Sequence, residues 1–365
     1  MAKELTVLLV GDVNCNQPDP YSMLRHVAPV LKQGDFVLGN LEGPICDHGE
    51  PSREKAVYGS PVHHRAPPRT ADALKKAGFT AVNMANNHMM DFTQGGLLQT
   101  LELLDEAGIA HVGAGRNIQE ARRPVFLEKG GLRLGFLGFT CIYTPVDFPA
   151  AENKPGVVCV RVTTSYQVPE NLAYSPGTWP RSNTIADPRD KEWVLDDVRR
   201  ARKESDLLVV SFHWGVSSRQ SAVSMDVADD FGPSWTIDYQ KELGRAAVDA
   251  GASLVMGHHP ARLHGMEFYK GGLICYSLGN FAFPKSIRAS HGLETCIVKA
   301  YIDPEEKRFT RFSFIPARLE EEPLEVPRPV PVEQAADIIE VVNRHSRDYG
   351  TRFHPAGDEV LIEPP

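Results

Sequence analysis

The chain has 365 residues, 42% of them hydrophobic, which is enough to build a large buried core. Its net charge of −8 and its short basic runs argue against nucleic acid as a partner, because nucleic-acid-binding proteins present a basic surface. No apolar run approaches the roughly 18 residues of a membrane-spanning helix, and residues 5–10 are too short for a signal-peptide core. The six cysteines form no C-x-x-C pair, so we expect free thiols in a reduced, cytoplasmic protein without membrane contact.

Short apolar strands alternate with amphipathic helices in the first half of the chain. The expected strands span 5–10, 36–38 and 80–85, and the expected helices span 19–32, 70–77 and 93–107. A polar loop rich in Pro, Gly and His spans 46–68. Because long loops in compact domains often carry function, we expect this loop to lie near a site.

The second half contains a weak internal repeat, in which residues 107–139 resemble residues 250–281. Each copy predicts a strand and then a hairpin across Gly-Gly, which suggests two packed sheets with helices outside. The Pro-rich segment 141–190 is expected to be an insertion or lid. We expect one domain over 1–318, followed over 319–365 by a linker, a C-terminal helix and a loosely held tail.

Six apolar runs each end in a residue that can bind a metal, move a proton or hydrogen-bond a substrate. Continuously apolar, β-branched runs are typical of strands buried on both faces. In open α/β sheets, ligands bind beyond the carboxyl ends of the strands. We therefore expect one site formed by the residues that follow these runs, which are Asp12, Asn40, Glu42, Asn87, His88, His213, His258 and His259.

A set of Asp, Asn, Glu and His suits a divalent ion such as Mn²⁺, Fe²⁺ or Zn²⁺, which could lower the pKa of bound water towards about 7. Taken singly, each residue also has a structural explanation; Asp12 could cap a turn and His213 could be a buried core histidine. The histidines of the 46–68 loop (His48, His63 and His64) are expected to be solvated. The candidate metal ligands are Asp12, Asn40, Glu42, Asn87, His213 and His258, and the candidate catalytic residues are Asp12, His88 as general acid, His259 and His291.

The residues at the strand ends belong to an ordered set of motifs, which are Gly11-Asp12, Asn40-Leu41-Glu42, Asn86-Asn87-His88 with Asp91, His213-Trp214-Gly215, Gly257-His258-His259-Pro260 and Tyr276–Phe281. This set resembles the CapA family, which is named for poly-γ-glutamate capsule synthesis and belongs to the calcineurin-like metallophosphoesterase superfamily. The resemblance implies an α/β fold, a four-layer α/β/β/α sandwich with the site at the strand ends. It implies metal-ligand positions at Asp12, Asn40 or Glu42, Asn87, His213 and His258, and the acid position at His88.

Three positions depart from the motifs of catalytic phosphoesterases. The usual Asp-x-His is Asp12-Val13-Asn14, the usual bridging Asp is Asn40, and Pro260 replaces the last His of Gly-His-x-His. These replacements remove ligands from one metal position. Two alternatives therefore stay open, one divalent metal (Mn, Fe or Zn) or none.

Three functions are compatible with these residues. The first is hydrolysis of a phosphoester or amide in a peptidic or small acidic substrate, by Asp/His acid–base chemistry with at most one metal. The second is cofactor-independent epimerisation of an α-carbon in a ribosomally made, lasso-type peptide, which needs two acid/base groups and stabilisation of an enolate. The third is non-catalytic binding in capsule synthesis. The candidate substrate-binding residues are Asn14, Trp214, Arg262, His264 and Asn280.

Overall fold

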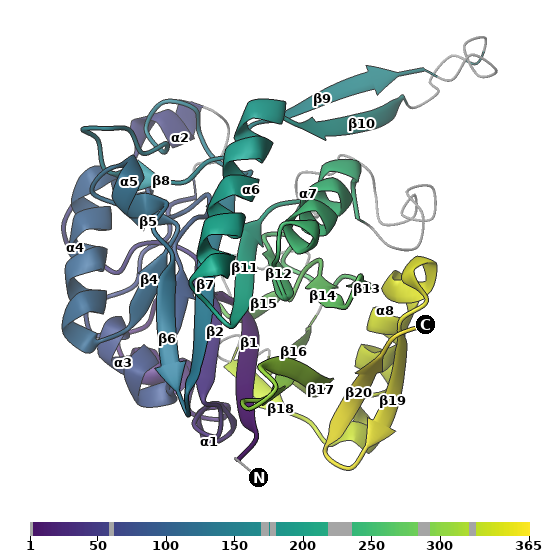
Figure 1. Cartoon of the computed structure of the whole chain (residues 1–365). Helices are drawn as coiled ribbons and strands as arrows, with labels where there is room; N and C mark the ends of the chain where they lie inside the picture. Colours follow the sequence, from purple (N-terminus) through teal and green to yellow (C-terminus); the bar gives the residue numbers. More distant parts are fainter. Residues whose placement is uncertain are drawn as a thin grey trace.

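The computed structural model describes residues 3–57, 62–168, 175, 180–217, 236–283, 293–320 and 326–365. Two β-sheets pack face to face, and helices cover their outer faces (Figure 1). The chain is therefore the predicted four-layer α/β/β/α sandwich. Among the described residues, no helix combines the length and the apolar composition needed to cross a membrane. All six cysteines lie in the described ranges and are free.

The larger sheet has ten strands, in the order β19-β20-β17-β16-β1-β2-β3-β4, with β15 beside β1 and β18 beside β17. Its strands β1 to β4 are paired in parallel, so their carboxyl ends lie at one edge of the sheet. The strands are β1 (Leu5–Val13), β2 (Phe36–Leu41), β3 (Ala81–Asn83), β4 (Ala110–Val112), β15 (Asn280–Ala282), β16 (Glu294–Asp303), β17 (Arg308–Glu320), β18 (Val326–Pro329), β19 (Arg352–Ala356) and β20 (Glu359–Glu363).

The smaller sheet has six strands in the order β13-β14-β12-β11-β7-β6. The strands are β6 (Val125–Lys129), β7 (Leu132–Thr140), β11 (Leu207–His213), β12 (Leu254–His258), β13 (Met266–Tyr269) and β14 (Gly272–Cys275). Both predicted Gly-Gly hairpins are present, as β6–β7 and β13–β14. Both hairpins lie in this sheet. The parallel strands β11 and β12 separate them, so each hairpin forms one end of the sheet.

Side chains that alternate along the central strands divide the core into three clusters. Leu9 and Leu38 of the larger sheet join Phe136 and Val209 of the smaller sheet in a core between the two. The outer face of the larger sheet packs on α1 (Ala28–Leu31), α3 (Thr70–Ala77) and α4 (Thr93–Ala107). The outer face of the smaller sheet packs on α6 (Pro188–Lys203) and α7 (Asp238–Asp249). Strands with both faces buried explain why the apolar runs are continuous.

The helix boundaries follow ordinary capping chemistry. Asp187 precedes α6 and accepts hydrogen bonds from the backbone N–H groups of Arg189 and Asp190. The helices α3 and α4 end at Gly78 and Gly108, both in the left-handed conformation that glycine adopts at low cost. The remaining elements are η1 (Pro20–Met23), α2 (Arg53–Val57), β5 (Ala114–Gly115), α5 (Ile118–Ala121), β8 (Gly156–Val157), β9 (Val162–Gln167), β10 (Arg181–Ala186), η5 (Val332–Gln334), α8 (Ala336–Ser346) and η6 (Arg347–Tyr349).

Two predictions from the sequence need correction. The helix expected over 19–32 is interrupted, because only η1 and α1 are helical there. The C-terminal segment is not loosely held; β18 and β20 both pair with β17, and α8 contributes Ile338 and Val342 to the core between the sheets. Within 141–190, β9 and β10 form a two-stranded ribbon that projects from the body of the molecule (Figure 1).

Candidate active site

The predicted strand ends meet at one edge of the two sheets. Asp12 on β1 lies opposite both Asn40 on β2 and Asn280 on β15, and His213 on β11 lies opposite His258 on β12. Gly11 permits this convergence, since a Cβ there would lie 1.9 Å from the backbone oxygen of Gly279. The sequence therefore brings these residues together through parallel strand register.

Asp12 is fully buried and held from three sides. Its carboxylate accepts a hydrogen bond of 2.9 Å from the Asn40 side chain and one of 3.3 Å from the His259 backbone N–H, and it lies 3.0 Å from His258 Nδ1. Burial alone would raise the pKa of Asp12, but His258, with His213 and Asn40, outweighs burial and lowers the pKa to about 2. Asp12 is therefore an ionised carboxylate at neutral pH.

The side-chain amide of Asn40 has a different role from the predicted metal ligand. Its Oδ1 accepts hydrogen bonds from Asn83 (3.0 Å) and Asn86 (3.3 Å). This arrangement turns the amide nitrogen, rather than the oxygen, towards Asp12 and towards His213 Nδ1 at 3.4 Å. An amide nitrogen has no lone pair to offer a metal, so Asn40 orients Asp12 instead.

His213 lies close to Asp12, because the Asn40 side-chain nitrogen contacts both residues. Its Nε2 is 2.8 Å from Asn87 Oδ1, and its ring lies edge-on to that of His259 with the centroids 4.9 Å apart. Burial, followed by the neighbouring His259, lowers the pKa of His213 well below its ordinary value. The imidazole is therefore neutral, which is the form that binds metals.

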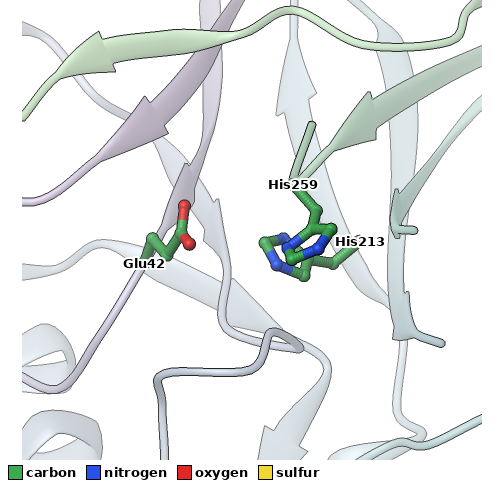
Figure 2. Close-up of side chains that lie close together, drawn as sticks. All are labelled: Glu42, His213 and His259. Carbon is green, nitrogen blue, oxygen red and sulfur yellow. The ribbon is translucent and has the colours of Figure 1, made fainter. Parts of the chain in front are cut away.

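Glu42, His213 and His259 form the tightest group of potential ligands among the described residues. One ligand atom from each lies within 4.8 Å of the others, all three residues are buried, and the Glu42 carboxylate points across the site towards the two rings (Figure 2). Burial and the adjacent Asp12 carboxylate raise the pKa of Glu42 well above its ordinary value, and its Oε2 has no hydrogen-bond partner among the described residues. A buried orphan oxygen beside the neutral His213 and the His259 ring fits one divalent cation.

His259 was predicted as a catalytic residue, and the structure places it in this ligand group. Its backbone φ is 96°, a value that residues other than glycine rarely adopt. Such a conformation costs on the order of 1–3 kcal/mol and is found mainly at functional sites. The strained turn aims the His259 ring at His213 while its N–H donates to Asp12.

His88, the predicted general acid, lies next to Glu42, with its Nε2 3.8 Å from Glu42 Oε1. Its Nδ1 is 2.7 Å from both Asp91 Oδ2 and the Nζ of Lys55. The His64 ring lies over His88 with the centroids 3.9 Å apart. Burial, followed by the Lys55 ammonium, lowers the pKa of His88 well below its ordinary value.

Lys55 and His64 are functional candidates that the sequence analysis missed. Both come from the 46–68 loop; Lys55 is 3% exposed in its side chain and His64 is 4% exposed, so His64 is buried rather than solvated as expected. The loop was predicted to lie near the site, but no strand end or residue pattern marked either residue. His48, in the same loop, is exposed as expected.

Two of the expected substrate-binding residues lie elsewhere. Trp214 is fully buried in the outer core, stacks on Phe212 with the centroids 4.7 Å apart, and donates from Nε1 to the Tyr276 carbonyl. His264 is buried against α8, where its ring lies 5.8 Å from that of His345. Both assignments are corrected, because these side chains pack in the interior.

The other expected residues remain near the strand ends. Asn14 donates from its side chain to the Glu42 carbonyl at 2.7 Å, and Asn280 lies opposite Asp12 in the sheet. Arg262 follows the strained turn and is partly buried, and its carbonyl accepts from Ser277 Oγ at 2.6 Å. His291 lies outside the described residues.

Comparison with known sequences places this site in a family. Residues 6–285 match the family described as bacterial capsule synthesis protein PGA_cap. The chain belongs to this family. The predicted resemblance to CapA proteins is thereby confirmed.

Named relatives support the same family. The capsule biosynthesis protein CapA of Bacillus anthracis is 32% identical over 290 residues, which cover 77% of this chain and 60% of that protein. The PGA biosynthesis protein CapA of Bacillus subtilis is 30% identical over 266 residues, covering 72% and 57%. A probable polyglutamine synthesis accessory protein of Mycobacterium tuberculosis is 26% identical over 334 residues, covering 90% and 76%. The chain thus spans about three fifths of the length of the two Bacillus CapA proteins.

Among solved structures, a novel phosphatase of Mycoplasma pneumoniae aligns with a TM-score of 0.49 and 12% identity, covering 94% of this chain and 100% of that chain. This similarity is too distant to bear on the activity of the PGA_cap chain.

Proposed function

We propose that this PGA_cap protein is a hydrolase that uses one divalent metal and cleaves an amide or phosphoester in a peptidic or acidic substrate. The observation that carries the proposal is the buried group of Glu42, His213 and His259, whose ligand atoms lie within 4.8 Å of one another. The names of the relatives, which refer to capsule and PGA biosynthesis, favour an acidic polymer or its precursors as the substrate.

The chain's own residues divide the chemistry between two sides of the site. Glu42, His213 and His259 would hold the metal, with the ionised Asp12 adding negative charge behind them. A bound divalent ion would supply Lewis-acid chemistry. His88, whose Nε2 lies 3.8 Å from Glu42 Oε1, is positioned to move a proton at that nitrogen, with Asp91 and Lys55 holding its Nδ1. The burial of all these groups strengthens their electrostatic interactions.

Metal analysis tests this proposal directly. The purified chain should bind one equivalent of Zn²⁺ or Mn²⁺, measured by calorimetry and elemental analysis, and His213→Ala should weaken that affinity by at least tenfold. His48→Ala, which removes an exposed histidine, is the matched control and should bind as the wild type does. Hydrolysis of a panel of phosphoesters and γ-glutamyl amides should require the metal. A chain that binds no stoichiometric metal contradicts the proposal.

A metal-independent peptide epimerase is the second candidate. The observation that favours it is that the ionised Asp12 and the neutral His88 provide a base and a proton carrier without any ion. Uptake of deuterium at the α-carbon of a peptide substrate in D₂O, persisting in the presence of a chelator, would support epimerisation over hydrolysis. Tight peptide binding without either reaction would instead support an accessory, non-catalytic role.

A further inference from the structure

The ribbon formed by β9 and β10 stands clear of the body of the molecule as a separate two-stranded sheet (Figure 1). Most of its described side chains are exposed, and large apolar side chains are among them. Tyr166 is 72% exposed, Ile185 is 58% exposed, and Val168, which follows β9, is 50% exposed. An isolated two-stranded ribbon is only marginally stable in water, and further strands stabilise it. We therefore compared the two edges of the ribbon as places for another strand.

The two edges differ in what covers them. On β10, the backbone N–H of Thr184 points outward and donates to Asp238 of α7 at 3.1 Å. Thr164 of β9 lies opposite Thr184, and two opposite residues in an antiparallel pair either bond to each other or both point their backbone groups away. The N–H and C=O groups of Thr164 and, two residues on, of Tyr166 therefore point away from β10. Within the described part of the chain, no hydrogen bond reaches these outward groups.

This free edge of β9 lacks the features that protect exposed edges in other proteins. Edge strands are usually interrupted by lysine, proline or a β-bulge, which prevent pairing with another chain. Residues 162–168 read VTTSYQV, with no charged residue and no proline, and β9 pairs with β10 without a shift in register. Because each copy of the chain has a net charge of −8, two copies approach each other most favourably where neither presents charge. The uncharged edge of β9 therefore suits a second copy of the chain.

The sequence of β9 also fits a symmetric pairing with itself. A twofold axis through Ser165 would place Thr164 opposite Tyr166 of the second copy, and Val162 opposite Val168. Each pair of Thr164 with Tyr166 would then exchange two hydrogen bonds through the groups that point outward. Alternate residues of a strand share one face, so these side chains would meet as valine with valine and threonine with tyrosine. Pairs of β-branched and aromatic side chains stabilise antiparallel sheets.

We propose that the chain forms a homodimer in which the β9 strands of two copies pair antiparallel about Ser165. The two ribbons then make one four-stranded sheet, whose outer edges are the β10 strands that contact α7 at Thr184. Closed twofold symmetry of this kind is the commonest arrangement of homo-oligomers. The dimer does not involve the active site and is independent of the proposed function.

Cross-linking of the full chain tests the register. In an antiparallel pair, opposite residues without hydrogen bonds between them have Cα atoms about 4.5 Å apart, within the roughly 4.4–6.8 Å that a disulfide spans. With oxidised glutathione as the electron acceptor, Ser165→Cys should therefore form a disulfide-linked dimer on a non-reducing gel. Thr163→Cys is the matched control, because Thr163 is exposed on the same strand but the register places it opposite Gln167. It should give no more dimer than the wild type, which keeps its six native cysteines.

Sedimentation velocity tests the dimer without any cross-link. The wild type should show a monomer–dimer equilibrium that shifts with concentration. Thr164→Pro removes an outward N–H and no bond between β9 and β10, so the ribbon should persist while dimer affinity falls by about tenfold or more. Ser165→Lys places like charges opposite each other at the axis and should also weaken the dimer. Thr163→Lys adds the same charge away from the axis and should dimerise as the wild type does.

The proposal is overturned by a wild-type chain that stays monomeric at the highest concentration. Equal cross-linking in Ser165→Cys and Thr163→Cys would also overturn it. A dimer that resists both Thr164→Pro and Ser165→Lys would have its interface elsewhere and would refute the pairing of β9. None of these measurements involves a metal or a substrate, so failure of the proposed hydrolase would leave their outcomes unchanged.

Discussion

His264 should make the stability of the protein fall as the pH drops below about 6.5. Burial, followed by the neighbouring His345 and Arg262, lowers the pKa of His264 from 6.5 to about 3 in the folded chain. Because the folded pKa is depressed, the unfolded chain takes up a proton at a higher pH than the folded chain does. The folded state therefore keeps its full stability above pH 6.5 and loses stability as the pH falls towards 3.

The size of the effect depends on the width of the pH window between the ordinary pKa of 6.5 and the folded pKa of about 3. One pH unit within the window corresponds to about 1.4 kcal/mol, so the roughly 1.5 units between pH 6.5 and pH 5 amount to about 2 kcal/mol. Urea unfolding at pH 8 and pH 5 measures the loss in the wild type and in His264→Gln, which cannot be protonated. The variant should lose about 2 kcal/mol less than the wild type between the two pH values. The exposed His48→Gln is the control and should follow the wild type. Equal losses in His264→Gln and the wild type would refute this account of His264.

Three further substitutions test the packing around the site. Gly11→Ala should abolish soluble expression, because its Cβ would lie 1.9 Å from the Gly279 oxygen; a folded variant by circular dichroism would contradict the close approach. Trp214→Ala should lower the free energy of unfolding by about 3–5 kcal/mol, the usual cost of emptying a buried aromatic site, and a loss below about 1 kcal/mol would argue against its place in the core. Tyr276→Phe removes the 2.6 Å hydrogen bond to the Glu267 carboxylate and should cost about 1.5–3 kcal/mol, measured by urea unfolding.

The sequence predicts the framework of the site well, because that framework depends on strand register. Apolar runs buried on both faces identify the central strands, and the residue after each run must lie at the carboxyl edge of the sheet. This reasoning places Asp12 beside Asn40, and His213 beside His258, as the structure shows. It does not state which atoms face the site, and so it could not show that Asn40 turns its nitrogen inward.

The errors arise where loop conformation or tertiary packing decides the outcome. Lys55 and His64 reach His88 from a loop whose path depends on contacts with Asp91 and Asn87, and no periodic pattern reveals such a path. Trp214 follows His213 directly in sequence, but neighbouring residues at the end of a strand point to opposite faces. His213 therefore faces the site and Trp214 packs in the outer core against Phe212.

The two carboxylates of the site favour the proposed binding of a cation despite the altered motifs. Asp12 and Glu42 are buried close together, and their negative charges would repel each other. The pKa of Asp12 is lowered by its histidine partners despite burial. The pKa of Glu42 is raised by burial and by Asp12 itself. The negative charge of Glu42 can be neutralised in two ways, by a proton or by a positive ion next to Oε2. A divalent ion held with His213 and His259 would remove the repulsion between the carboxylates and displace that proton. Asn40 and Pro260 stand where catalytic phosphoesterase motifs have ligands of one metal position, while Glu42, His213 and His259 still form a group of potential ligands.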